Sequence, residues 1–158
     1  MSGEGLLLFS HGSLLCGAGQ ALDEHAARLR ARGMLVEIGY LNYSDPPVEA
    51  AASRLIDAGA RRIVVAPYFL VPGFFVTKSL PERLDSVRAE HPGVEFSIAD
   101  ALGEDELLAD ALVAAAAQAT DDPLQWRDLS AAAAACRARP DCPLYGTARC
   151  PATARIAV

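Results

Sequence analysis

Short apolar runs alternate with longer amphipathic stretches over the first 120 residues of the chain. A continuously apolar run of about six residues is typical of a strand buried on both faces, whereas apolar positions three or four residues apart predict a helix. Glycine or Pro-Gly at the ends of several amphipathic stretches marks helix ends. The pattern predicts strands at 5–10, 36–41, 62–67 and 95–99, and helices at 19–32, from 45–47 to 58, 80–91 and 104–120.

Strands and helices in strict alternation predict an α/β domain with a four-stranded parallel sheet and helices on both faces. Ligands of such sheets bind beyond the carboxyl ends of the strands. Functional residues are therefore expected in the loops that leave those ends. These loops span 10–19, 41–47, 68–79 and 100–105.

The character of the chain changes at Asp121-Asp122-Pro123. Residues 124–137 are compatible with one more helix, and the remainder is rich in Pro, Gly and Cys. We therefore predict an α/β domain at 1–120 and a C-terminal helix with a cysteine-containing tail at 121–158. A segment this small does not build an ordinary core, so it must dock on the domain, bind a metal or stay mobile.

Composition and charge exclude several classes of partner. The formal net charge is −6 and Lys78 is the single lysine, so the basic surface that nucleic-acid binding requires is missing. No apolar run is long enough to span a bilayer, and Met1-Ser2-Gly3-Glu4 does not resemble the start of a signal peptide. We expect a cytoplasmic protein that binds neither nucleic acid nor membranes.

His11 is the first candidate for chemistry. It follows the first strand in a loop with Gly12 and Ser13, at the edge predicted to hold the ligand. An imidazole accepts a proton near neutral pH and also binds transition metals. A structural histidine that hydrogen-bonds the first turn fits the position equally well.

The run from Leu7 to Ser13, Leu-Leu-Phe-Ser-His-Gly-Ser, resembles the opening strand and loop of the small class II chelatases, the sirohydrochlorin cobaltochelatase and ferrochelatase group. The resemblance continues at 59–70, 80–82, 91–94 and 101–103, and covers about residues 5–118. It implies a homodimer that inserts Co²⁺ or Fe²⁺ into sirohydrochlorin or a related reduced tetrapyrrole without a nucleotide or other organic cofactor. It also implies that His11 binds the incoming metal and removes pyrrole protons.

Two positions depart from the pattern of that family. Phe75 occupies the place of a second active-site histidine, and Asn42 the place of an acidic residue. Aspartates such as Asp45, Asp100 and Asp105 lie in the right loops to compensate, although Asp45 and Asp105 are also placed to cap helices. Alternatively, the domain keeps a tetrapyrrole pocket without catalysis, or the tail supplies the missing ligands.

Residues around His11 suit a large flat ring that carries carboxylates. Aromatic side chains favour an apolar cleft, and an ammonium group favours charge-assisted bonds to carboxylates. For the aromatic residues, core or dimer packing is the alternative interpretation. The predicted substrate-binding residues are Ser10, Gly12, Ser13, Tyr68, Phe74, Phe75 and Lys78.

Four cysteines suggest a second metal centre. Cys16 lies in the His11 loop, and Cys136, Cys142 and Cys150 lie in the tail. Four thiolates are the usual complement of a [4Fe–4S] cluster or a structural zinc, although free thiols or a disulfide are equally compatible. A cluster allows a different function, that of a non-catalytic tetrapyrrole or metal carrier, and the tail alone would suit a metal-regulated interaction module.

Overall fold

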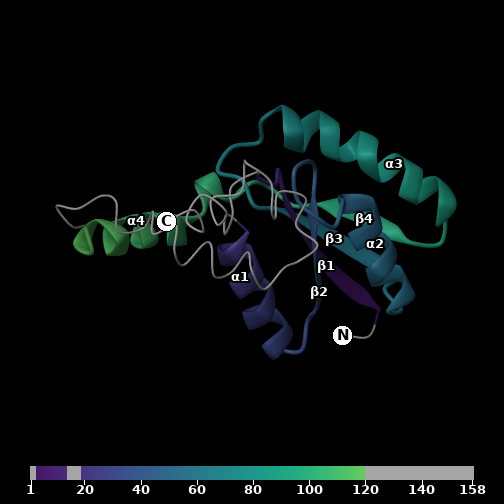
Figure 1. The fold of residues 1–158 in the computed structure, drawn as a ribbon, viewed down its shortest axis with the longest axis horizontal. Coiled ribbons are helices and arrows are strands. Elements are labelled where there is room, and N and C mark those ends of the chain that lie inside the picture. Colours follow the sequence, from purple (N-terminus) through teal and green to yellow (C-terminus); the bar gives the residue numbers. More distant parts are fainter. Residues whose placement is uncertain (1–2, 14–18, 120–158) are drawn as a thin grey trace, which may run out of the picture.

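The four predicted strands and four predicted helices are present in the computed structural model, which describes residues 3–13 and 19–119 (Figure 1). The strands are β1 (Glu4–Ser10), β2 (Leu35–Tyr40), β3 (Arg62–Pro67) and β4 (Glu95–Ile98). The helices are α1 (Gln20–Ala31), α2 (Val48–Asp57), α3 (Leu80–Glu90) and α4 (Glu106–Ala117). Two short turns, the π-helical η1 (Phe75–Ser79) and the 3₁₀ turn η2 (Leu102–Glu104), fall in stretches predicted as loops. The predicted helix at 124–137 and the cysteine tail lie outside the described residues.

All four strands are parallel, in the order β2-β1-β3-β4. The predicted parallel α/β sheet is therefore confirmed. Leu7 of β1 pairs with Glu37 of β2 on one side and with Val65 of β3 on the other. Because the strands run in one direction, the loops after β1, β2 and β3 leave from the same edge, where a ligand site is expected.

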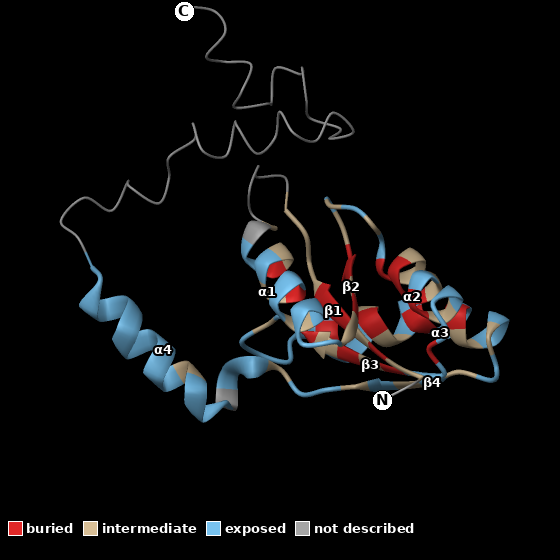
Figure 2. Cartoon of the chain, turned by 90° about the horizontal axis from the view of Figure 1, so that it is seen from below, coloured by how far each residue is buried: buried red, intermediate tan, exposed pale blue. Residues whose placement is uncertain are grey.

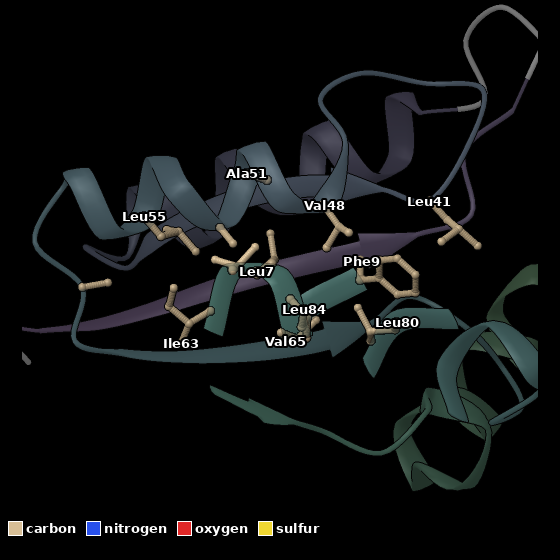
Figure 3. Packing of buried hydrophobic residues seen from close by; sticks show 13 residues of the cluster. Leu7, Phe9, Leu41, Val48, Ala51, Leu55, Ile63, Val65, Leu80 and Leu84 are labelled. Atoms are coloured by element: carbon tan, nitrogen blue, oxygen red, sulfur yellow. The ribbon is translucent and has the colours of Figure 1, made fainter. Parts of the chain in front are cut away.

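The larger core lies between the sheet and the helices α2 and α3. Inward-facing residues of β1 and β3 alternate along each strand and meet apolar residues of the two helices (Figure 3). Alanines at 51 and 52 bring α2 close to the strands. The fully buried members include Leu7, Phe9, Leu55, Ile63, Val65, Leu80 and Leu84.

The opposite face of the sheet carries α1. Leu22 and Ala26 of this helix pack on Leu8, Val36, Ile38 and Tyr40 of the strands β1 and β2.

The helix α4 departs from the expected arrangement, because it projects away from the sheet (Figures 1 and 2). None of its residues is buried, and Leu107, Leu112 and Val113 are 74%, 64% and 71% exposed. Three helices, α1 to α3, therefore cover the sheet, and the fourth predicted helix adds nothing to the core in the described part of the chain.

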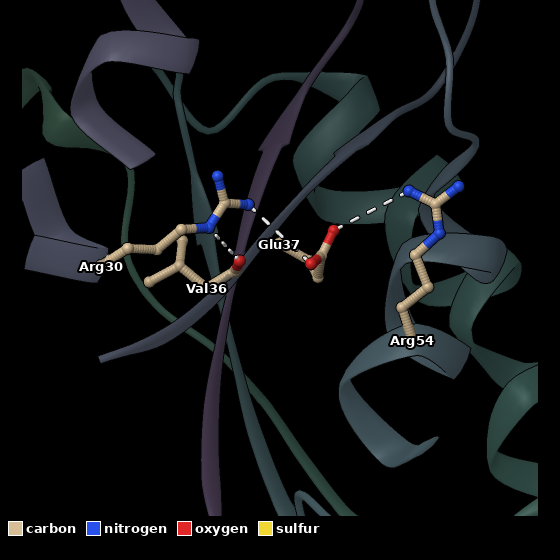
Figure 4. A network of polar contacts seen from close by, with 4 residues as sticks. All are labelled: Arg30, Val36, Glu37 and Arg54. Carbon is tan, nitrogen blue, oxygen red and sulfur yellow. Dashed lines mark hydrogen bonds and ion pairs between the residues drawn. The ribbon is translucent and has the colours of Figure 1, made fainter. Parts of the chain in front are cut away.

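A charged network crosses the edge strand β2. The Glu37 carboxylate lies 3.8 Å from Arg30 of α1 and 3.9 Å from Arg54 of α2, and Arg30 Nε donates to the Val36 carbonyl at 2.9 Å (Figure 4). Such half-exposed pairs contribute little stability singly. They do place charge along an edge strand, which discourages pairing with another chain.

No helix within residues 3–13 and 19–119 combines the length and the apolar character needed to cross a bilayer.

Candidate active site

The loop after β1 is held by the loop after β2. Leu41 N–H donates to the Ser10 carbonyl at 3.0 Å, and Asn42 N–H donates to the His11 carbonyl at 2.9 Å. Ser13 N–H then donates to Ser44 Oγ at 3.1 Å. These bonds continue the β1–β2 pairing past the strand ends, so the backbone on either side of the His11 side chain is fixed.

Gly12 makes this junction possible. Its φ is +84°, a left-handed conformation that glycine adopts at the lowest steric cost. A Cβ at this position would also collide with the backbone oxygen of Asn42. Backbone geometry therefore requires glycine at the centre of the sequence His-Gly-Ser.

The imidazole of His11 is half-buried, and its Nδ1 lies 3.2 Å from the Gly12 carbonyl oxygen. A carbonyl oxygen only accepts, so a hydrogen bond here requires the proton on Nδ1. The remaining ring lone pair is then on Nε2, which is the atom left to bind a metal or to accept a proton.

Two aromatic rings contact the His11 ring. The Phe75 centroid lies 4.5 Å away with an interplanar angle of 46°, and the Tyr43 centroid lies 5.5 Å away with an angle of 59°. Tyr43 has a φ of 61°, a left-handed conformation that is uncommon for a tyrosine. The sequence analysis did not select Tyr43, because no local motif shows that this backbone would turn its ring toward His11.

Phe74 is the N-cap of the π-helical turn η1, which begins at Phe75 and leads directly into α3. Val76 of this turn is buried and anchors it, while Phe74 is 62% and Phe75 38% exposed. The Phe74 ring contacts the Phe75 ring at 6.1 Å, and Lys78 Nζ lies 5.7 Å from the Phe74 centroid. An exposed aromatic surface with an ammonium group at its margin therefore adjoins His11.

An open cavity of about 260 Å³ is lined by Phe75 and by the start of the loop after β2. Arg83 at its rim is held by Glu49 at 2.9 Å. Sequence reasoning did not assign Ser79 or Glu82 to a pocket, because only the turn into α3 brings them beside the β2 loop. The lining residues are Leu41, Asn42, Phe75, Ser79, Glu82 and Arg83.

Other predicted site residues lie elsewhere. The Tyr68 ring contacts His25 of α1, with centroids 5.8 Å apart, rather than joining the aromatic pair at His11. Cys16, Cys136, Cys142 and Cys150 are outside the described residues. Among residues 3–13 and 19–119, no three His, Cys, Asp or Glu side chains are grouped as a metal site.

The two aspartates predicted as helix caps behave differently. Asp105 caps α4, because its Oδ1 accepts from the Leu107 N–H at 2.9 Å. The prediction for Asp45 is wrong, since Pro47 is the N-cap of α2 and no side chain caps that helix.

The chain was compared with known protein families and their members. The family model CbiX matches residues 5–119. The sirohydrochlorin cobaltochelatase of Sulfurisphaera tokodaii is 31% identical over 108 residues, which is 68% of this chain and 87% of that protein. The sirohydrochlorin cobaltochelatase of Methanocaldococcus jannaschii is 34% identical over 90 residues, or 56% of this chain and 63% of that protein. The chain thus spans less than two thirds of the length of this second relative.

A solved structure supports the same fold. The sirohydrochlorin chelatase SirB from Bacillus subtilis subspecies spizizenii, in complex with cobalt, superposes with a TM-score of 0.68 at 22% identity. The match covers 84% of this chain and 61% of that one. At this identity the likeness concerns the fold alone.

Proposed function

Because the chain belongs to the CbiX family, we propose that it inserts Co²⁺ or Fe²⁺ into sirohydrochlorin or a related reduced tetrapyrrole. The observation that carries the proposal is the position of His11. Its ring lies at the carboxyl edge of the sheet, beside the exposed aromatic surface of Phe74 and Phe75. A metal-binding base next to a large apolar surface is what the insertion of a metal into a flat ring requires.

The reaction balances with a single base that removes the two pyrrole protons one after the other. A divalent metal replaces the protons of two pyrrole N–H groups, and each nitrogen keeps its electron pair to bind the metal. His11 Nε2 accepts a pyrrole proton and passes it to water, which reaches the half-buried ring. The same lone pair first binds the incoming metal, and it is free to accept a proton once the metal has moved to the pyrrole nitrogens. Neutral imidazole suits both Co²⁺ and Fe²⁺.

The residues around His11 would hold the substrate. Phe74 and Phe75 present apolar surface to the tetrapyrrole plane, and Lys78 would meet a peripheral carboxylate. Ser10, Gly12 and Ser13 form the backbone wall of the loop that carries the base. Tyr68 lies next to α1, so it would contact only a part of the tetrapyrrole that extends past the end of β1.

Anaerobic metal insertion tests the proposal. Purified protein is mixed with sirohydrochlorin and Co²⁺, and separately Fe²⁺, and the absorbance change is compared with the spontaneous reaction and with serum albumin. We expect an initial rate proportional to the protein concentration. Ring binding without acceleration, by protein whose circular dichroism shows a native fold, would instead support the carrier alternative.

Phe75→His should improve metal capture. The Phe75 and His11 rings are 4.5 Å apart, so a histidine here puts two imidazoles within reach of one metal ion. We expect the KM for Co²⁺ to fall about tenfold, which corresponds to about 1.4 kcal/mol for an added ligand. Steady-state kinetics with varied Co²⁺ and the visible absorption of bound Co²⁺ measure this change.

Phe74→His is the matched control for that variant, because Phe74 contacts Phe75 and Lys78 rather than His11. Because Phe74 also presents apolar surface to the tetrapyrrole, the comparison is made at saturating sirohydrochlorin, where Phe74→His should leave the KM for Co²⁺ unchanged. An equal gain in both variants would show that any added surface imidazole suffices, and that the position next to His11 has no special role.

The assembly and location that we propose are a homodimer and the cytoplasm. The exposed apolar side chains of α4 support an oligomer, since a monomer rarely leaves so much of a helix uncovered. Nothing in the relatives described above favours the carrier with a [4Fe–4S] cluster, and the cysteine ligands proposed for it lie outside the described residues.

A further inference from the structure

Tyr43 lies at the centre of a three-residue turn in the loop after β2. Its φ is 61°, and Ser44 N–H donates to the Asn42 carbonyl at 2.8 Å. A hydrogen bond across a single residue with positive φ is the pattern of the classic γ-turn, which is rare and strained. In this left-handed conformation the Cβ of a tyrosine crowds the carbonyl oxygen that follows it. The loop therefore holds Tyr43 in a conformation that its residue type disfavours.

Hydrogen bonds to the loop after β1 hold this turn on both sides. Asn42 N–H donates to the His11 carbonyl at 2.9 Å, and Ser44 Oγ accepts from Ser13 N–H at 3.1 Å. Backbone strain persists only where the surrounding structure determines it, and it is concentrated at functional sites. The strain at Tyr43 is thus maintained by the loop that carries His11.

The ring of Tyr43 adds little to the stability of the fold. It is 57% exposed, and it belongs to neither of the two buried clusters of the described residues. A ring this exposed removes little apolar area from water, so burial does not account for the strained backbone. Within the same part of the chain its ring contact is with His11, at a centroid distance of 5.5 Å.

The imidazole of His11 depends on such a contact for its orientation. Metal-binding histidines are usually fixed by the hydrogen bond from their other ring nitrogen. For His11 that bond is 3.2 Å long, at the upper end of the usual range, and its acceptor belongs to the next residue. A half-turn of the ring about the Cβ–Cγ bond would break it and move Nε2 from its place. The rings of Tyr43 and Phe75 contact the imidazole and hinder that rotation.

We propose that Tyr43 is a positioning residue for metal insertion. Its ring, placed by the strained turn, holds the His11 imidazole in the orientation that leaves Nε2 to the metal and the pyrrole protons. Tyr43 acts through His11, so the inference rests on the proposed function, in which His11 is the base and metal ligand. Because the contact is between two rings, the role belongs to the aromatic ring and not to the phenol hydroxyl.

The tautomer of the His11 imidazole tests this role without metal or tetrapyrrole. Long-range ¹H–¹⁵N correlation spectra of the full-length chain are recorded about two pH units above the ordinary imidazole pKa of about 6.5, so that the ring is neutral. We expect wild type and Tyr43→Phe to hold the proton mainly on Nδ1. Tyr43→Leu and Tyr43→Gly should show a larger population with the proton on Nε2. His11→Ala assigns the signals, and the His25 signals should be the same in every variant.

Turnover and stability separate positioning from a merely structural role. Tyr43→Gly removes the ring and also relieves the left-handed strain, so its urea midpoint should not fall below that of wild type. Its kcat for metal insertion at saturating sirohydrochlorin should nevertheless fall about tenfold or more, the usual effect of losing a group that orients a metal ligand. Tyr43→Phe should keep the wild-type kcat and KM.

Each contrary result has a distinct meaning. An unchanged His11 tautomer in Tyr43→Gly would overturn the positioning role, and a lowered kcat beside it would assign Tyr43 to substrate contact instead. A loss of turnover in Tyr43→Phe as large as in Tyr43→Gly would transfer the role to the hydroxyl. Failure of wild-type protein to accelerate metal insertion would refute the proposed function. It would be told apart from failure of the Tyr43–His11 contact, because the tautomer is measured on the protein alone.

Discussion

His11→Ala should lower the rate of metal insertion by about 10²–10⁴-fold, the usual contribution of a positioned general base, while the fold stays intact. The side chain is half-buried, and within residues 3–13 and 19–119 its hydrogen bond is the one from Nδ1 to the Gly12 carbonyl, so its removal leaves no buried polar group of this part of the chain unsatisfied. The loss should therefore appear in the insertion rate and not in the urea midpoint of unfolding. Anaerobic absorbance kinetics and urea titration measure the two quantities on the same preparation.

His25→Ala is the matched control, since His25 is also half-buried and also contacts an aromatic ring, that of Tyr68. It should keep nearly the wild-type insertion rate. Added imidazole should partly restore His11→Ala, because the aromatic rings of Tyr43 and Phe75 remain to receive it. Turnover of His11→Ala within about twofold of wild type would remove this residue from the chemistry.

Gly12→Ala should lower the free energy of unfolding by about 2–5 kcal/mol and abolish insertion. The alanine would be held at a φ of +84°, and its Cβ would collide with the backbone oxygen of Asn42. Relief of that clash must pull the His11 loop away from the β2 loop and break the bond from Asn42 N–H to the His11 carbonyl. Urea unfolding and the insertion assay report the two consequences.

Two other glycines separate the causes of that loss. Gly33 has a φ of +82° with open space around the missing Cβ, so Gly33→Ala carries the backbone strain alone and should cost about 1 kcal/mol. Gly93 has neither a positive φ nor a neighbour within 4 Å, so Gly93→Ala should change stability by less than about 0.5 kcal/mol. If Gly12→Ala cost no more than Gly33→Ala, the close approach to Asn42 would not be a constraint on the loop.

The alternation of apolar runs and amphipathic stretches was sufficient to predict the four strands and the four α-helices of the described residues, but not the short turns η1 and η2. Local periodicity carries that information, because a buried strand such as Arg62–Pro67 and a helix such as Leu80–Glu90 each satisfy their pattern within a few residues. The rule that ligands bind at the carboxyl edge of a parallel sheet then selected the loop that holds His11.

The surroundings of His11 were only partly predictable. The sequence identified Phe75 as a departure from the family pattern. Its contact with the His11 ring depends on the π-helical turn η1, at whose first position it lies. Tyr43 and the cavity residues Ser79 and Glu82 were missed, because they meet the site through pairing between loops distant in sequence. Such contacts depend on register and on a left-handed residue, neither of which leaves a periodic trace.

The sequence by itself therefore determined the strands and α-helices, the parallel direction of the strands, the family resemblance and the loop that carries the base, whereas the strand order came from the structure. Only the tertiary structure decided which side chains meet at that base and where the last helix goes. The sequence of α4 resembles that of a core helix, yet the helix projects away from the sheet (Figure 2). The turn before it is fixed to the loop after β3 by the bond from Leu102 N–H to the Phe69 carbonyl and by the close approach of Gly103 to the Leu70 carbonyl. A hydrophobic pattern shows that a surface favours burial, whereas only the tertiary structure shows which other surface it packs against.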